Sequence, residues 1–139
     1  MSHYQTVRDL LRSSPKIWLV TGAAGFIGSN LVETLLSLNQ TVVGLDDFST
    51  GHRHNLVAIE QAVGAAHWRR FRFIEASICN LDACQDAARG ADYVLHQAAL
   101  GSVPRSIDKP LASFAANCTG FMNVMNAARE ASVQKFVYA

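Results

Sequence analysis

The chain has 139 residues, which is enough for one domain with a substantial hydrophobic core. Half of the residues are apolar and the formal net charge is +1, so there is no basic surplus to attract nucleic acid and no acidic tail. The apolar runs are too short to span a bilayer, and the charged N-terminus lacks a signal-peptide core. Together these features predict a cytoplasmic protein with no membrane partner.

The first predicted element is a short amphipathic helix over residues 3–13. It is indicated by four apolar residues near helical spacing, namely Tyr4, Val7, Leu10 and Leu11. We expect this extension, residues 1–15, to pack on the surface of the domain that follows. Association with a membrane is the alternative, which the small apolar face disfavours.

From residue 16 to residue 139 the chain alternates between short apolar strands and helices. The predicted strands are 16–21, 41–46, 71–75, 92–96 and 134–138, and the predicted helices are 26–38, 55–65, 81–89 and 110–131. This alternation predicts an α/β fold with a doubly wound, Rossmann-like parallel sheet of about five strands in the order 3-2-1-4-5. A cofactor is then expected where the order reverses, between the first and fourth strands.

Local signals support several helix boundaries. Asn80 is a predicted N-cap, Gly90 is expected to close the same helix, and Pro110 suits the first turn of the last helix. In the helix over 26–38, the apolar residues at helical spacing are expected to be buried; these are Ile27, Leu31, Leu35 and Leu38.

A glycine-rich turn joins the first strand to the first of these helices. Thr21–Gly28 reads TGAAGFIG, so Gly22, Gly25 and Gly28 recur at three-residue spacing between an apolar strand and an apolar helix. Backbone N–H groups and the positive end of the helix dipole can hold a pyrophosphate there, and the missing side chains let it approach. The turn therefore predicts a dinucleotide site.

An acidic residue follows the second strand. Asp46 lies 18 residues after Gly28, close to the position of the acid that binds the adenosine ribose hydroxyls in such sites. Its charge would repel a 2′-phosphate, which favours NAD over NADP. The counter-signal is Arg53, which could accept that phosphate from later in the loop.

Four blocks occur in this order: TGAAGFIGSN, LDDFSTG, HQAALGSVPRS and NCTG. Together they resemble the extended short-chain dehydrogenase/reductase family, from about residue 4 to the last residue. They are most similar to the nucleotide-sugar 4-epimerases that act on UDP-N-acetylglucosamine and its uronic acid, enzymes that supply sugars for surface polysaccharides. The resemblance implies oxidation of the sugar at C4 by hydride transfer to NAD⁺, and return of the hydride to the other face of the 4-keto intermediate.

The resemblance also implies cofactor contacts. The pyrophosphate contacts would be Gly22, Gly25, Phe26, Ile27 and Gly28. Asp46 would bind the adenosine ribose, and the adenine end would be surrounded by Asp47, Phe48, Ser49, Thr50, Gly51, Ser77 and Ile78. The nicotinamide ribose would be bordered by Gln97, Ala98 and Ala99.

Beyond the cofactor, the resemblance implies that Ser102, Val103 and Arg105 face the UDP-sugar. Asn117 matches the asparagine that supports the family's catalytic tyrosine–lysine pair. One departure is Ser77, because the family usually has an acidic residue there; a serine hydroxyl should bind the adenine amino group more weakly.

Structural readings compete with these functional ones. His96 follows an apolar strand and is either a buried histidine or a general base, with the first favoured. Asn117 and Arg105 could be ordinary polar surface residues. His52 and His54 lie in a polar loop without a partner thiol, so surface positions are favoured over metal ligation. The three cysteines, Cys79, Cys84 and Cys118, have no CxxC spacing and are expected to be free thiols.

The family's Tyr-x-x-x-Lys motif is not found, since none of the three tyrosines is followed by a lysine four residues later. One hypothesis is that the sequence is the amino-terminal half of an epimerase, or of a nucleotide-sugar dehydratase or reductase. The other is a non-catalytic dinucleotide-binding module. Under either, the chain alone is expected to bind NAD without catalysis. The family's full-length enzymes are expected to be homodimers, and a sheet that is open after its fifth strand should make the chain self-associate.

Overall fold

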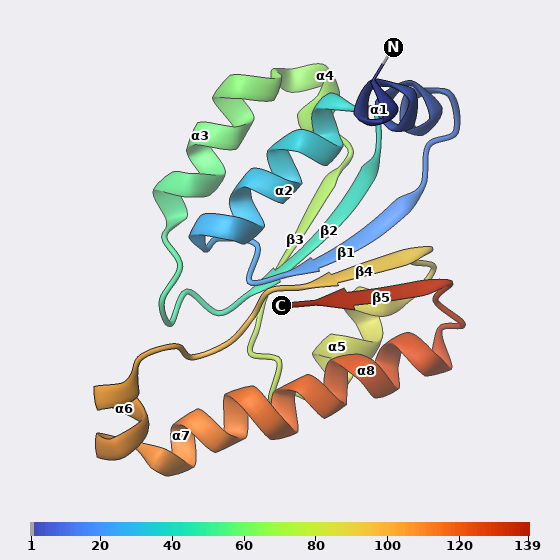
Figure 1. Ribbon diagram of the computed structural model, residues 1–139. Helices are drawn as coiled ribbons and strands as arrows, with labels where there is room; N and C mark the ends of the chain where they lie inside the picture. The colour runs from blue at the N-terminus through green and yellow to red at the C-terminus, as the bar shows by residue number, and fades with distance from the viewer. Residues whose placement is uncertain (1) are drawn as a thin grey trace.

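A single parallel sheet lies at the centre of the computed structural model, which describes residues 2–139 (Figure 1). Its strand order is β3-β2-β1-β4-β5, and every neighbouring pair is parallel, so the predicted topology is confirmed. The strands are β1 (Ile17–Thr21), β2 (Thr41–Asp46), β3 (Phe71–Glu75), β4 (Tyr93–His96) and β5 (Lys135–Tyr138).

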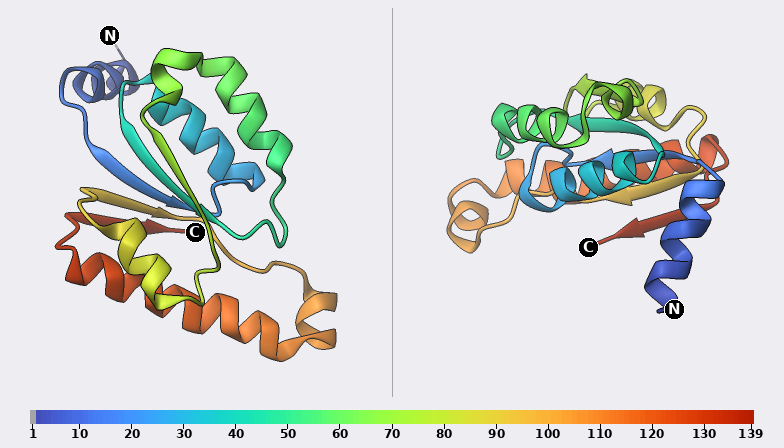
Figure 2. Two further views of the ribbon diagram at one scale, coloured as in Figure 1. Left: turned by 180° about the vertical axis from the view of Figure 1, so that it is seen from behind. Right: turned by 90° about the horizontal axis from the view of Figure 1, so that it is seen from above.

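Helices cover both faces of the sheet (Figures 1 and 2). One face carries α2 (Phe26–Ser37) and α3 (Arg53–Val63), and the other carries α5 (Leu81–Ala88) and α8 (Phe121–Glu130). The remaining helices are α1 (His3–Ser13), α4 (Ala65–Trp68), α6 (Val103–Asp108), α7 (Pro110–Phe114) and the π-helix η1 (Ala115–Gly120). Within residues 2–139, no helix combines the length and the apolar character needed to cross a bilayer.

Each face of the sheet has its own core. Consecutive residues of β1 point to opposite sides, so Val20 packs with Leu36 and Ile59 beneath α2 and α3, whereas Leu19 packs with Val124 beneath α5 and α8. Because both faces are covered, the central strands are continuous apolar runs rather than alternating ones.

The buried face of α2 differs in part from the predicted one. Leu35 and Leu38 are buried as expected, but Leu31 is only half-buried and Ile27 is 55% exposed; Val32 and Leu36 complete the buried face. The first turn of α2 lies beyond the packed core at the glycine turn, where Ile27 lines a pocket instead.

The segment predicted as one helix over 110–131 has three parts. Pro110 occupies the first turn of α7 as predicted, and the chain then passes through η1 into α8. Six residues are π-helical, a local widening that is frequent at functional sites. The preceding stretch also forms a short helix, α6, which the sequence did not indicate; Ser102 caps it by accepting a bond from Arg105 N.

The predicted limits of α5 are confirmed. Asn80 Oδ1 accepts a hydrogen bond from Ala83 N, and Gly90 follows the helix with a φ of +76°. Such a φ favours glycine, which is why the helix ends there.

The N-terminal helix is attached through a buried glutamine. Gln40 Nε2 donates to the carbonyl oxygens of Leu11 and Leu38, both at 2.7 Å, and Gln40 Oε1 accepts from Lys16 N and Trp18 Nε1. All four hydrogen-bonding positions of the amide are therefore used. The apolar residues at the start of α1 remain outside the core, with Tyr4 64% exposed.

Candidate functional site

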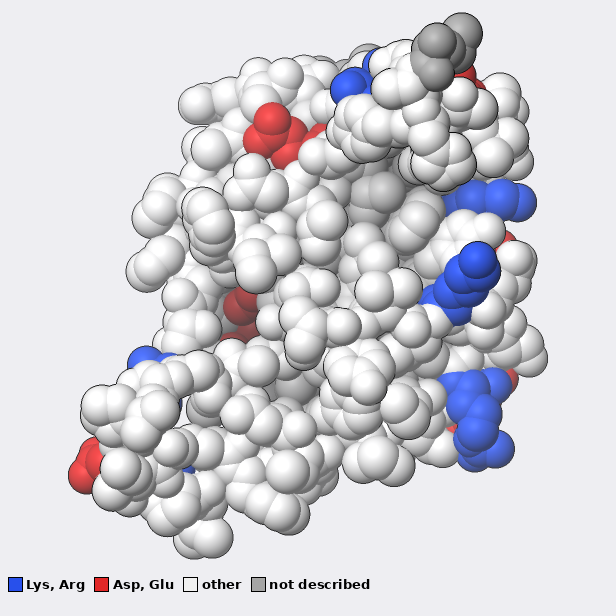
Figure 3. Space-filling view, in the orientation of Figure 1, with Lys and Arg blue, Asp and Glu red and all other residues white. Residues whose placement is uncertain are grey.

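The segments singled out by the sequence come together at the carboxyl edge of the sheet. The glycine turn follows β1, the Asp46 loop follows β2, and the segments beginning at Ala76 and Gln97 follow β3 and β4. Figure 3 shows the molecule hollowed between its two helical layers, with acidic side chains inside the hollow. Three adjoining pockets occupy this edge, and two residues, Gln97 and Ala99, are each shared between two of them.

The first pocket surrounds the glycine turn and has a volume of about 270 Å³. Gly22 has a φ of +67°, and a Cβ on it would lie 2.9 Å from Ala98 N. A Cβ on Gly28 would collide with Gly22 O and lie 2.7 Å from Gly22 C, so the start of α2 can approach the turn only because Gly28 has no side chain. The lining residues are Gly22, Gly25, Phe26, Ile27, Gly28, Thr50 and Gln97, all of which the resemblance had assigned to the cofactor.

Asp46 links this turn to the loop after β2. Its side chain is buried, Oδ2 accepts from Ala24 N at 2.9 Å, and Oδ1 accepts from Phe48 N at 2.8 Å. Asp46 therefore organises the loop after β2. Each carboxylate oxygen also has a second lone pair, so Asp46 retains the capacity to accept from ribose hydroxyls.

Further contacts hold the loop after β2 against the glycine turn. Ala24 O accepts from His52 N at 3.0 Å and from Asn55 Nδ2 at 2.8 Å. A Cβ on Gly51 would lie 2.8 Å from Ala24 C, so Gly51 serves close packing rather than lining a pocket. Sequence reasoning missed Asn55, for which the only signal was a polar residue in the first turn of a helix.

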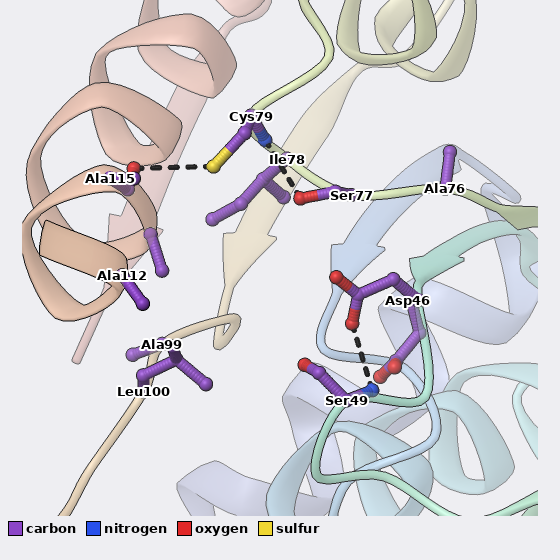
Figure 4. Close-up of a pocket in the computed structure, with 12 residues that line it drawn as sticks. Asp46, Ser49, Ala76, Ser77, Ile78, Cys79, Ala99, Leu100, Ala112 and Ala115 are labelled. Atoms are coloured by element: carbon purple, nitrogen blue, oxygen red, sulfur yellow. Dashed lines mark hydrogen bonds between the residues drawn. The ribbon is translucent and has the colours of Figure 1, made fainter. Parts of the chain in front are cut away.

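The second pocket, also about 270 Å³, is a slot beside Asp46 (Figure 4). Among the predicted residues it is lined by Asp46, Asp47, Ser49, Ser77, Ile78 and Ala99. Sequence reasoning missed the others, which are Ala76, Cys79, Leu100, Ala112, Ala115 and Ala116. Figure 4 shows Ala112, Ala115 and Leu100 across the slot from Asp46 and Ser49, so one wall is apolar and the other is polar and acidic. An apolar slot with a polar rim suits a flat heterocycle such as adenine.

Two hydrogen bonds fix the end of this slot. Ser77 Oγ accepts from Cys79 N at 3.2 Å, and Cys79 Sγ donates to Ala115 O at 3.3 Å. The Ser77 hydroxyl, expected to accept from an adenine amino group, thus already accepts one backbone bond. The only sequence signal for this slot was the run of small side chains that form its wall in α7 and η1.

The third pocket, about 260 Å³, lies between the loop after β4 and the start of α8. It is lined by His96, Gln97, Ala98, Ala99, Asn117, Phe121 and Ala139. Asn117 pairs with the backbone of Leu100 through both amide atoms, since Oδ1 accepts from Leu100 N at 2.8 Å and Nδ2 donates to Leu100 O at 2.9 Å. Asn117 therefore holds the loop after β4 in place.

His96 is a buried, neutral residue of this region. Thr21 Oγ1 accepts from Gln97 N and Ala98 N, so its own hydrogen is free to point to His96 Nδ1, 2.7 Å away. Burial lowers the pKa of His96 from 6.5 to about 4. Both observations favour the structural reading of His96 over a general base. Thr21, which sequence reasoning missed, organises this end of β4.

The residues expected to face a sugar lie at the N-cap of α6 (Ser102) and within α6 (Val103 and Arg105), apart from the three pockets. Ser102 has a φ of +117°, Val103 is 72% exposed, and Arg105 Nη1 donates to Gly101 O at 2.9 Å. Arg105 lines a separate surface hollow with Pro104. The structure thus does not join these three residues to the three pockets at the carboxyl edge of the sheet, and their substrate role stays a prediction.

The residues considered for metal binding or disulfides lie apart. His52 and His54 are exposed and stack on each other, with ring centres 5.0 Å apart; His52 is the N-cap residue of α3 and His54 lies in its first turn rather than in the predicted loop. Residues 2–139 contain no cluster of three or more metal-ligating side chains. The cysteines are free thiols, and burial raises the pKa of Cys84 to about 11.

Comparisons with known proteins agree on the relationship of this chain. Residues 18–139 match the sequence profile of the NAD dependent epimerase/dehydratase family. The UDP-glucose 4-epimerase of Mycolicibacterium smegmatis is 41% identical over 121 residues, which cover 86% of this chain and 37% of that protein. The chain thus spans little more than a third of the length of this relative.

Solved structures show the same partial coverage. The UDP-glucose 4-epimerase of Stenotrophomonas maltophila, with bound NAD and formylated UDP-arabinopyranose, is 31% identical with a TM-score of 0.79, covering 88% of this chain and 36% of that one. The UDP-N-acetylglucosamine 4-epimerase of Methanobrevibacter ruminantium, in complex with UDP-N-acetylmuramic acid, is 28% identical with a TM-score of 0.75 and the same coverage, 88% and 36%.

Proposed function

Because the chain belongs to the NAD-dependent epimerase/dehydratase family, we propose that its three adjoining pockets bind NAD and that it forms the cofactor-binding part of a UDP-sugar 4-epimerase. Support comes from the site itself as well as from the relatives. The glycine turn, the Asp46 carboxylate and the loop after β4 meet where the strand order reverses, which is the usual place for a dinucleotide in an open α/β sheet.

One observation carries the proposal: Ala24 N donates to Asp46 Oδ2 at 2.9 Å. This bond makes the phosphate cradle and the acceptor for the ribose a single rigid unit. The cradle also fits a pyrophosphate. A Cβ on Gly28 would collide with Gly22 O, one on Gly22 would lie 2.9 Å from Ala98 N, and one on Gly25 would lie 3.2 Å from Gly22 O, so the turn stays free of side chains at these positions, at the start of α2, where helix N–H groups favour a phosphate.

Each pocket then has a part of the cofactor to hold. The glycine pocket binds the pyrophosphate, Asp46 accepts from the adenosine ribose hydroxyls, and the alanine-walled slot holds the adenine. The pocket beside Asn117 borders the nicotinamide ribose through Gln97, Ala98 and Ala99. NAD, when bound, supplies the hydride acceptor for oxidation of a sugar alcohol.

The proposed reaction is epimerisation at C4 of a UDP-N-acetylhexosamine or its uronic acid, in the supply of sugars for surface polysaccharide. It is supported by the blocks around GSVPRS and by the similarity to the enzyme from Methanobrevibacter ruminantium. The dehydratases of the same family are the second candidate, since the family description includes both reactions. With no Tyr-x-x-x-Lys motif, a polypeptide of these 139 residues binds NAD without catalysis.

Calorimetric titration tests the proposal. The purified chain should bind NAD⁺, and bind NADP⁺ more weakly, because the Asp46 carboxylate repels a 2′-phosphate. A folded chain that binds neither dinucleotide, or prefers NADP⁺, would contradict the assignment. If this polypeptide alone epimerised UDP-N-acetylglucosamine, the proposal that it binds NAD without catalysis would be contradicted.

We also propose that this polypeptide self-associates, as its exposed apolar surface favours. β5 is an edge strand on which Val137 and Tyr138 are 53% and 61% exposed, and Ile107 and Leu111 are 76% and 85% exposed on α6 and α7. Sedimentation equilibrium should show species larger than the monomer, and a clean monomer would contradict this. Full-length relatives are proposed to be homodimers.

A further inference from the structure

An arginine, an aromatic ring and a carboxylate form a cluster beside the adenosine end of the site. Arg53, the first residue of α3, donates from Nη2 to Glu75 Oε1 at 2.6 Å. Its guanidinium carbon lies 4.2 Å from the centre of the Phe48 ring, a distance typical of cation–π stacking. Phe48 in turn packs against Phe73, with ring centres 5.3 Å apart. Arg53 is thus held from two sides.

This cluster is connected to the proposed ribose acceptor. Asp46 and Glu75 are register partners at the ends of the neighbouring strands β2 and β3, and Phe48 N donates to Asp46 Oδ1 at 2.8 Å. The acid that would face the 2′-hydroxyl, the guanidinium that could neutralise a 2′-phosphate, and the carboxylate paired with that guanidinium therefore stand together. Two negative charges offset one positive charge in this group.

We propose that Glu75 is a selectivity residue that favours NAD over NADP by keeping the Arg53 guanidinium engaged. The proposal rests on the function proposed above. A phosphate is bound well by a guanidinium whose N–H fork is free, and the Glu75 carboxylate already accepts from that fork. The stack on Phe48 would hold the guanidinium in place when the carboxylate is removed, so the loss of Glu75 presents a free, positioned cation.

The alternative is an ordinary surface ion pair that only anchors the start of α3. The two side chains are 68% and 53% exposed, so the pair contributes little to stability in either case. The two readings differ in one measurable respect. A structural pair has no effect on the choice between dinucleotides, whereas a selectivity residue changes the affinity for NADP⁺ alone.

The test compares the dissociation constants of NAD⁺ and NADP⁺ for the 139-residue chain and for two variants, Glu75→Gln and Glu75→Ala. Both variants lack the carboxylate. NADP⁺ binding should tighten about tenfold, the order expected for one freed charge-assisted contact, and NAD⁺ binding should change less than about twofold. Glu60→Gln is the control, because it removes the same charge from an exposed position of α3 that has no ion pair within residues 2–139.

The double variant Glu75→Gln with Arg53→Leu should lose the gain, since the freed cation is gone. NADP⁺ affinity that is unchanged in both Glu75 variants would overturn the inference. A gain in NADP⁺ affinity that survives in the double variant would also overturn the inference, and so would an equal gain in Glu60→Gln. Either result would indicate a general effect of charge. A wild-type chain that melts cooperatively but binds no NAD⁺ would instead overturn the proposed function.

Discussion

Thr21 Oγ1 lies 2.7 Å from His96 Nδ1 and joins the carboxyl ends of β1 and β4. This is where the strand order reverses and where the pockets proposed to bind the cofactor adjoin. The same hydroxyl accepts from Gln97 N and Ala98 N, both at 3.1 Å. A single buried threonine thus sets both the tautomer of His96 and the path of the loop after β4.

Replacing Thr21 with valine should destabilise the fold by about 1–3 kcal/mol, since the part-buried Ala98 N–H and the buried His96 ring nitrogen lose their partner. Urea unfolding of Thr21→Val measures this loss. Thr41→Val is the matched control, at a half-buried strand position whose hydroxyl has no hydrogen bond within residues 2–139. Equal midpoints for the two variants would show that the hydroxyl network contributes nothing.

Stability should depend on the titration of His96. Its pKa is about 4 in the folded state against an ordinary 6.5, so the unfolded chain binds more protons between these values. The His96 contribution is fully present above pH 6.5 and is lost progressively as the pH falls toward 4, by about 2 kcal/mol at pH 5.

The variant His96→Asn removes this titration, while its amide oxygen can still accept from the Thr21 hydroxyl. The free energy of unfolding at pH 8 minus that at pH 5 should be smaller for it than for the wild type. His52→Asn, at an exposed position, should leave the difference unchanged. If His96→Asn keeps the wild-type pH dependence, the assigned pKa is wrong.

Adding a methyl group at Gly28 should disrupt the glycine turn. A Cβ there collides with Gly22 O, and the neighbour is backbone that cannot move aside. We expect Gly28→Ala to lose about 3 kcal/mol and NAD⁺ binding with it. Gly101→Ala is the control, because its added Cβ meets nothing within 4 Å. Calorimetry measures NAD⁺ binding and thermal melting measures stability for both variants. Normal NAD⁺ affinity in Gly28→Ala would contradict the proposal that the glycine turn holds the pyrophosphate.

Removing the Asn117 amide should reduce the affinity for NAD⁺ more than it reduces the stability of the fold. Both of its bonds hold Leu100, and the side chain is exposed, so we expect Asn117→Ala to cost less than about 1 kcal/mol of stability. A looser loop after β4 should raise the dissociation constant for NAD⁺ about tenfold. Asn126→Ala is the control, because within residues 2–139 its amide hydrogen-bonds to Glu130 and Arg129 and not to the loop after β4. Equal affinities would assign Asn117 no role in the site.

The topology was predictable because it rests on local and repetitive signals. Buried parallel strands are short apolar runs, and the helices between them are marked by residues such as Asn80, Gly90 and Pro110. The glycine turn was predictable for a similar reason, since Gly22 and Gly28 stand where a side chain cannot fit.

Other features depend on contacts between distant segments. The slot that faces Asp46 is walled by Ala112 and Ala115, which follow it in sequence by more than sixty residues. Alanine side chains leave room beside a helix, but they do not indicate which distant segment they face. The sequence did not predict the π-helical turn at Asn117 or the short helix α6 either. The residues of the π-helical turn suit an ordinary α-helix equally well, and those of α6 suit a loop equally well.

The sequence by itself determined the strand order, the glycine turn that is proposed to hold a pyrophosphate and the acid beside it, since periodicity, glycine spacing and one carboxylate are local properties of the chain. Only the tertiary structure decided the contacts of His96, Asn117 and Arg53. A polar side chain acts through the partner it meets, and here those partners are Thr21, Leu100 and Glu75. Each of these pairs is separated by 17 or more residues in the chain, and packing of the sheet and its helices brings them together.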